Sequence, residues 1–361
     1  MMHKRILSLD VFRGASIAGM ILVNTFEDNS IKQLQHAPWH GFTFADSIFP
    51  FFLWISGVSI VFAFKRHLEE GTSKSKIIIQ VIKRSLILFV LGILLYSFPF
   101  YDFQTIRILG VLQRIAICYL VVSTIFLFTK IRMQAIFTAI LLLGYWLILK
   151  YVPVPGVGRG VLEMNGNIVQ YVDLTFLRGH LWSPMWDPEG ILSTLGAIAT
   201  MFFGVLAGQT LFAKESSIKR VMELFVSGIA LMALGLIMNI WLPINKNLWT
   251  SSYVVFTAGL SSFVFAVLYF IVELKKYIQW AHPLVIYGEN PITIYALSII
   301  VAKSLMLINF HDNSLWEHMH KIMFATIKNN TMVELLFAFF YLVFLYAVAY
   351  VMYKRQWFIK I

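Results

Sequence analysis

Apolar runs of about twenty residues recur along the whole chain, and about 20 helical residues are enough to cross a bilayer core of about 30 Å. A hydrophobic fraction of 59% and a charged fraction of 13% exclude a disordered chain, a coiled coil and an ordinary cytosolic enzyme. We therefore expect one all-α polytopic membrane domain over residues 1–361, with about ten transmembrane helices. The expected spans are roughly 5–26, 43–64, 77–98, 105–128, 134–151, 190–212, 220–242, 252–272, 283–308 and 332–353.

The charge pattern predicts the orientation. The chain carries 29 lysines and arginines against 18 acidic residues, and most of the basic residues fall in short connections on the N-terminal side. The positive-inside rule accounts for this excess without a nucleic-acid partner and predicts that both termini are cytosolic. The long connections 27–42, 152–189 and 309–331 then lie on the far face, where chemistry on an external substrate is expected.

Ionisable residues within the spans are functional candidates because burying them in a membrane is costly. Asp10 and Arg13 share one helix face, and they form either an internal ion pair or a site for an anionic cofactor. Arg114 suits phosphate or carboxylate recognition, or it pairs with a carboxylate such as Asp46 or Glu289. Arg107, near the start of the same span, is interpreted as an interfacial anchor.

The ninth span contains Gly288, Asn290 and Pro291. Proline removes an amide donor and glycine loosens the turn before it, so we expect at least one broken helix. A half-helix that begins at Pro291 could present free backbone amides to an anion, while a simple kink is the alternative.

A short far-face loop brings Asn24, His36 and Asp46 within reach of one another. A histidine beside a carboxylate can act as a general base, and an asparagine amide could hold a developing oxyanion. The alternative is a solvated loop histidine. The spacing of the remaining histidines does not suit a metal site, and we expect none.

Several short motifs follow one another in a specific order and spacing. They occupy residues 8–14, 23–24, 36–39, 41–46, 49–50, 110–114, 153–156, 187–192 and 243–249. On these motifs the chain resembles the transmembrane heparan-α-glucosaminide N-acetyltransferase family, in a shorter bacterial form, essentially from end to end.

The resemblance implies transfer of acetyl from cytosolic acetyl-CoA to the amine of glucosamine or a terminal glucosaminide on the far side of a bacterial inner membrane. It matches His36 to the family's catalytic histidine and Asn24 to an asparagine beside the acetyl group. This chain departs from the animal enzyme on a late helix, where the position of a second histidine of that enzyme falls near Ser298. We expect Asp46 to orient His36, which acts as a general base or, alternatively, carries the acetyl group covalently.

We expect acetyl-CoA to place its anionic end near Arg13, Arg114, Gly288 and Asn290. Candidates for the binding site of the acceptor sugar, at its opening to the far face, are Asp187, Glu189, Asn245, Asn247 and Trp249. Trp249 either stacks on a sugar ring or anchors the chain at the membrane interface.

Two rival functions share the helical architecture. One is O-acetylation of a surface glycan or lipid. The other is a transporter or flippase, which the lack of visible internal repeats disfavours. Membrane lipid is an expected partner of any such chain, and we also expect a homodimer because dimers are common among membrane enzymes.

Overall fold

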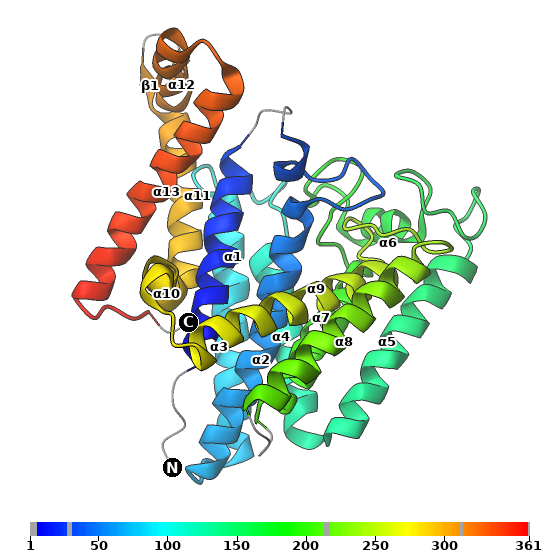
Figure 1. The fold of residues 1–361 in the computed structure, drawn as a ribbon. Coiled ribbons are helices and arrows are strands. Elements are labelled where there is room, and N and C mark those ends of the chain that lie inside the picture. The colour runs from blue at the N-terminus through cyan, green and yellow to red at the C-terminus, as the bar shows by residue number, and fades with distance from the viewer. Residues whose placement is uncertain (1–5, 27–30, 213–216, 311–312, 360–361) are drawn as a thin grey trace.

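The computed structural model describes residues 6–26, 31–212, 217–310 and 313–359, and this part is mainly helical (Figure 1). The elements are α1 (Leu7–Thr25), η1 (Lys32–Leu34), η2 (Phe44–Ser47), α2 (Ile48–Glu69), α3 (Lys74–Ser97), α4 (Val111–Phe128), α5 (Ile131–Tyr151), α6 (Ile168–Leu177), α7 (Ser193–Phe212), α8 (Ser217–Met238), α9 (Ser251–Tyr269), η3 (Phe270–Leu274), η4 (Gln279–Ala281), α10 (His282–Glu289), α11 (Pro291–Leu307), β1 (Asn309–Phe310), β2 (Asn313–Ser314), α12 (Leu315–Ile327) and α13 (Asn330–Lys354).

The predicted fold class is confirmed. Within the described residues, nine helices are long and apolar enough to cross a membrane, and one bent pair makes a tenth span. These ten segments correspond to the ten expected spans. The chain is therefore an all-α polytopic integral membrane protein with one broken helix.

The centre of the bundle is the contact between α2 and α7, and glycines make it close. A Cβ on Gly57 would overlap the carbonyl oxygen of Met201, and one on Gly204 would overlap that of Trp54. Small residues let helix backbones approach in this way, which is the usual basis of packing between membrane helices. By contrast, α3, α5 and α8 leave most of their apolar side chains exposed or only half-buried, as lipid-facing helices do.

The broken span consists of α10 and α11, which are bent by 75°. Pro291 begins α11 and lacks the amide that would continue the hydrogen-bond ladder. Arg13 of α1 donates to the Gly288 carbonyl at 3.4 Å, next to this break. Gly288 itself is required by packing, because a Cβ there would overlap the carbonyl oxygen of Asp10.

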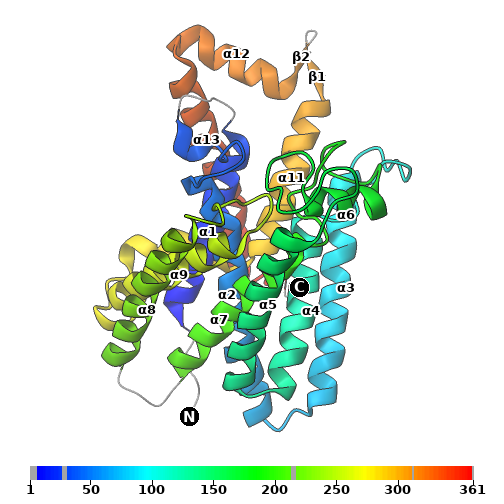
Figure 2. The ribbon, with the colours of Figure 1, turned by 90° about the vertical axis from the view of Figure 1, so that its right-hand side faces the viewer.

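Some predicted boundaries are wrong by several residues, and short helices were not predicted. The fourth span begins at Val111 instead of 105, since Gly110 is fully extended and starts the helix there. The short helix α6 is begun by Asn167, whose side chain accepts from the Gln170 amide, and α12 has a Ser314–Glu317 capping box. Figure 2 shows α12 lying crosswise over the ends of α11 and α13.

The chain contains a single cysteine, Cys118, in the middle of α4. Its side chain is fully buried in the main hydrophobic core, among residues of α2, α3 and α7.

Candidate functional site

His36, Asp46 and Lys246 form a compact polar cluster at the end of the bundle where α1 and α5 finish. His36 follows η1, Asp46 lies in η2, and Lys246 lies in the turn between α8 and α9. The His36 Nδ1 atom is 2.9 Å from Asp46 Oδ1. The Lys246 Nζ atom is 3.0 Å from His36 Nε2 and 3.9 Å from Asp46 Oδ1.

The Asp46 carboxylate is held rigidly by its neighbours. Its Oδ2 atom accepts from the backbone amides of Ala37 at 3.1 Å and Thr43 at 3.0 Å. The Tyr253 hydroxyl donates to the Asp46 carbonyl at 2.6 Å, and the residue is 1% exposed. Because Oδ1 accepts the Nδ1–H of His36, the imidazole carries its lone pair on Nε2, where the Lys246 ammonium lies within hydrogen-bond distance.

The cluster is open on the histidine side. The His36 side chain is 46% exposed, so a substrate can reach it, whereas that of Lys246 is 15% exposed. Burial lowers the pKa of Lys246, although Asp46 and Glu189 counter part of this effect. A partly desolvated ammonium beside an accessible imidazole can stabilise negative charge that develops on a substrate.

The turn that carries Lys246 is shaped by Asn245. Its Oδ1 atom accepts from the Leu248 amide at 2.8 Å, and its Nδ2 atom lies 3.2 Å from His40 Nδ1. Asn247 is half-buried in the same turn. Asn24 is exposed near the end of α1, and within the described part of the chain no hydrogen bond joins it to His36.

Trp249 ends this turn with a positive φ of 51° and is 0% exposed. Its Nε1 donates to Thr200 at 3.1 Å, and its ring packs edge-on against those of Phe49 and Tyr253. A ring this deeply buried is not a surface platform for a sugar.

A buried ion-pair cluster lies behind the turn. Arg107 donates to both carboxylate oxygens of Asp187, at 2.9 and 2.6 Å, and also to Glu189. Burial opposes ionisation of Glu189, but Arg107, Arg114 and Lys246 outweigh it and hold the pKa of that carboxyl below its usual value. The interpretation of Arg107 as an interfacial anchor is wrong, because this side chain is buried and paired.

Arg114 lies fully buried near the start of α4. Its Nη2 atom donates to the Gly190 carbonyl at 3.1 Å and to Ser193, and its guanidinium lies 4.9 Å from the Trp249 ring centre. The Nε and Nη1 atoms have no hydrogen-bond partner within the described residues. Neither Asp46 nor Glu289, the partners considered from sequence, hydrogen-bonds to Arg114 in this part of the chain.

The expected cofactor residues separate into two groups. Arg13 contacts Gly288, Asp10 at 3.0 Å and Ser59 at 2.9 Å, so the ion pair considered from sequence is present. The Asn290 side chain binds the Trp357 carbonyl at 3.0 Å and the Ile359 amide at 2.9 Å. Arg114 belongs instead to the layer of Trp249, near the His36 cluster.

A very small apolar cavity of about 10 Å³ lies between α1, α2, α4 and α11. Its lining residues are Ile17, Met20, Phe49, Phe52, Val111, Leu112, Ile115, Ile292 and Tyr295. Phe49 separates this cavity from Trp249, and Ile292 belongs to the first turn of α11. The cavity therefore lies between the layer of Arg114 and the helix break.

Lys246 is the site residue that the sequence analysis did not single out. It lies 210 positions from His36, and in the sequence it is one of several loop lysines. The available signal is its position within the motif 243–249, between two asparagines.

Comparison with known proteins agrees with the motifs. The family described as "Heparan-alpha-glucosaminide N-acetyltransferase, catalytic" matches residues 5–166. The mouse and human proteins named heparan-alpha-glucosaminide N-acetyltransferase are 29% and 30% identical over 350 and 348 residues, which cover 81% of this chain. The chain spans about half the length of these curated relatives, 53% and 52% respectively. The resemblance of this chain to the heparan-α-glucosaminide N-acetyltransferase family, inferred from its motifs, is thus confirmed.

Proposed function

We propose that the chain is a membrane N-acetyltransferase that moves acetyl from acetyl-CoA to the amine of glucosamine or a terminal glucosaminide. The observation that carries the proposal is the His36–Asp46 hydrogen bond, with its carboxylate fixed by two backbone amides. This arrangement supports a base at His36 Nε2. The resemblance to acetyltransferases supports the reaction class.

In the proposed reaction His36 acts as a general base. The acceptor ammonium loses one proton to solvent, and its nitrogen attacks the thioester carbonyl of the donor. His36 Nε2 takes the second proton from that nitrogen and passes it to the departing CoA thiolate. The Asp46 carboxylate stabilises the imidazolium between these two transfers. We favour this route over an acetyl-histidine because it needs one fewer intermediate.

Lys246 is the proposed holder of the oxyanion. Its ammonium lies 3.0 Å from His36 Nε2 and 3.1 Å from Nδ1, beside the place where the acceptor nitrogen has to bind. The flexible four-carbon stem lets the ammonium move aside, toward the oxygen of the tetrahedral intermediate. Asn24 and Asn247, which are exposed and half-buried at the same end of the bundle, are proposed contacts for the acceptor.

For acetyl-CoA, we propose that the pantetheine arm enters along the apolar seam between α1, α2, α4 and α11, whose cavity of about 10 Å³ has to widen to hold it. Arg114, with its unpartnered Nε and Nη1 atoms, is suited to a carbonyl or phosphate oxygen of the donor. At the other end of the cavity, the proposed contacts of the donor are Arg13, Gly288 and Asn290. There the donor has to displace the existing partners of Arg13 and Asn290, which are Asp10 and the backbone of Trp357.

Four of the residues expected at the acceptor site are proposed to act on it indirectly, by holding other side chains in place. Asp187 and Glu189 hold Arg107. Asn245 shapes the turn that carries Lys246, and Trp249 packs against Arg114. We further propose that both termini face the cytosol of a bacterium and that the His36 cluster faces the opposite side of its inner membrane. The excess of basic residues in the N-terminal-side connections supports this orientation.

The test uses purified protein, labelled acetyl-CoA and glucosamine. Wild type should form labelled N-acetylglucosamine. The His36→Ala variant should form none while binding CoA normally, and His67→Ala, which removes an exposed histidine of α2, should retain activity. Normal transfer by His36→Ala would refute the site. CoA binding without N-acetylglucosamine formation would redirect the search to hydroxyl acceptors, and no CoA binding would favour a transporter.

A further inference from the structure

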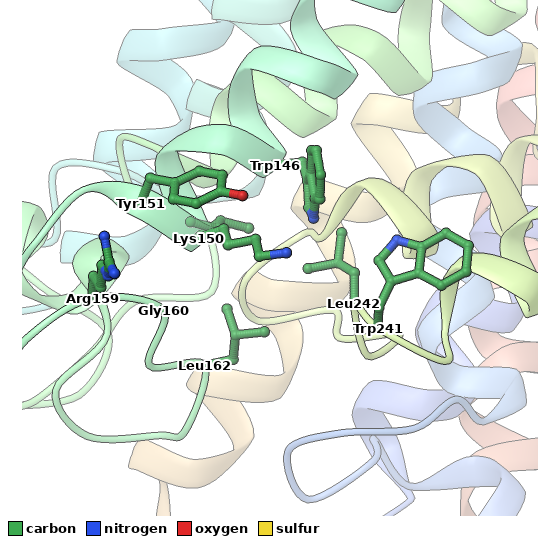
Figure 3. Close-up of a pocket in the computed structure, with 9 residues that line it drawn as sticks. Trp146, Lys150, Tyr151, Arg159, Gly160, Leu162, Trp241 and Leu242 are labelled. Carbon is green, nitrogen blue, oxygen red and sulfur yellow. The ribbon is translucent and has the colours of Figure 1, made fainter.

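A second pocket, of about 370 Å³, opens beside the last turn of α5 (Figure 3). It is formed by the end of α5, the loop that follows it and the turn after α8. The lining residues are Trp146, Leu149, Lys150, Tyr151, Arg159, Gly160, Leu162, Trp241 and Leu242. Gly160 adopts a φ of +75°, a left-handed conformation that favours glycine, and this turns the loop beside Arg159.

The polar groups in this pocket are almost all donors. Figure 3 shows the Lys150 Nζ atom and the indole nitrogens of Trp146 and Trp241 facing the same space. Arg159 adds a second positive charge, and the lining contains no carboxylate. Within the described residues, none of these four side chains makes a hydrogen bond or an ion pair with the protein. The pocket is therefore complementary to an anion that carries several acceptor oxygens.

The surface below the pocket is apolar. Along α5, Ile136, Ile140, Leu143 and Leu147 are 50%, 58%, 60% and 46% exposed, and their spacing of three or four residues places them on one face. The next position on that face is Lys150. A lipid-exposed stripe thus leads directly to two cations and two tryptophans, which is the composition of a membrane interface.

We propose that this pocket binds the phosphodiester headgroup of an anionic phospholipid, with the acyl chains along the α5 stripe. The apolar stripe favours a lipid over a soluble anionic sugar, because a sugar has no acyl chains to pack against it. The headgroup is recognised by its phosphate and not by a quaternary amine. The position of such an amine against the Trp146 and Tyr151 rings is already taken by the Lys150 ammonium, at 5.2 and 5.5 Å. This inference is independent of the proposed function.

A lipid in this pocket contacts a loop that is bonded to the His36 segment. The Trp39 indole donates to the carbonyl of Leu162, a lining residue, at 2.8 Å. Leu242, on the other wall, is four residues before Lys246. The bound headgroup is therefore expected to brace both segments that carry the cluster.

The experiment measures lipid binding to the purified full chain in neutral detergent, by native mass spectrometry and by thermal shift. The probes are dioleoyl phosphatidylglycerol, dioleoyl phosphatidylcholine, inorganic phosphate and a sulfated disaccharide. We expect phosphatidylglycerol to bind best. The Lys150→Ala/Arg159→Ala double variant should weaken it about ten- to thirtyfold, since each cation near a membrane surface contributes about one factor of five.

The control variant is Arg178→Ala, which removes an exposed cation just after α6 and should leave binding unchanged. A single charge reversal, Arg159→Glu, tests the same site should the double variant be unstable. Equal binding of both lipids, or a double variant that binds like wild type, would overturn the proposal. Tighter binding of phosphate or of the sulfated disaccharide than of phosphatidylglycerol would also overturn it, since the stripe would then contribute nothing.

Discussion

The Asp46→Asn substitution tests the proposed base with almost no change in shape. In the native chain, Oδ2 accepts from two backbone amides and Oδ1 accepts from His36. An asparagine must turn its oxygen toward the two amides, because the opposite orientation would set three donors against one another. Its NH₂ group then faces His36 Nδ1, which becomes an acceptor. The imidazole proton moves to Nε2, and that atom is no longer a base.

The expected cost follows from this tautomer change. A positioned general base contributes about 10²- to 10⁴-fold to a rate. Since the His36 side chain is 46% exposed, water can replace part of its function, and we expect the lower half of that range. The turnover number should fall about 10²- to 10³-fold, which corresponds to about 3 to 4 kcal/mol. The KM for glucosamine should change little, because the acceptor contacts remain.

The assay is acetyl transfer from labelled acetyl-CoA to glucosamine, with wild type and Asp46→Asn compared at equal protein. The matched control is Glu163→Gln, the same chemical change at a carboxylate 3.8 Å from His40 and 77% exposed, which should leave turnover unaltered. If Asp46→Asn turned over as fast as wild type, the carboxylate would not set the tautomer and the reasoning would fail.

Three further predictions concern other parts of the structure. Lys246→Met should lower kcat about 10²- to 10³-fold, with partial recovery in Lys246→Arg, and an unchanged kcat would remove it from the mechanism. Arg107→Met leaves two buried carboxylates unpaired and should destabilise the protein by about 3 to 5 kcal/mol in thermal unfolding. Arg66→Met breaks an exposed ion pair with Glu70 and should lower the unfolding free energy by less than about 1 kcal/mol. Equal losses of stability in the Arg107 and Arg66 variants would contradict this prediction. Burial raises the pKa of Asp173 to about 7, so its ionisation should destabilise the fold by up to about 4 kcal/mol as the pH rises from 4 to 8. Asp173→Asn should flatten that decline, and parallel curves would argue against it.

The spans could be predicted because membrane helices need about twenty apolar residues, a strong and local signal. The break at Pro291 was also local, since proline removes a donor wherever it occurs. The helices α6 and α12 lie outside this signal, as they are shorter and amphipathic. The role of Gly288 depended on a contact with Asp10, on a helix far away in the sequence, and no local pattern reports it.

The candidate site also contains features that are local in the sequence and features that depend on long-range contacts. His36 and Asp46 were brought together by a ten-residue separation, which sequence can reveal. Lys246 joins them from a distant turn. Arg107 was misinterpreted because its partners, Asp187 and Glu189, lie about eighty residues further on. Long-range pairs of this kind decide which charges are buried and paired, and only the packed structure brings them into contact.

Cys118 has a practical consequence for studying this protein. A chain whose sole thiol is enclosed in its core already serves as a low-background scaffold for cysteine labelling. Ser75→Cys and Arg159→Cys each introduce an exposed thiol, at the beginning of α3 and in the loop after α5. In intact cells an impermeant maleimide should mark the second and spare the first, so that the sidedness of the His36 cluster can be read from a gel.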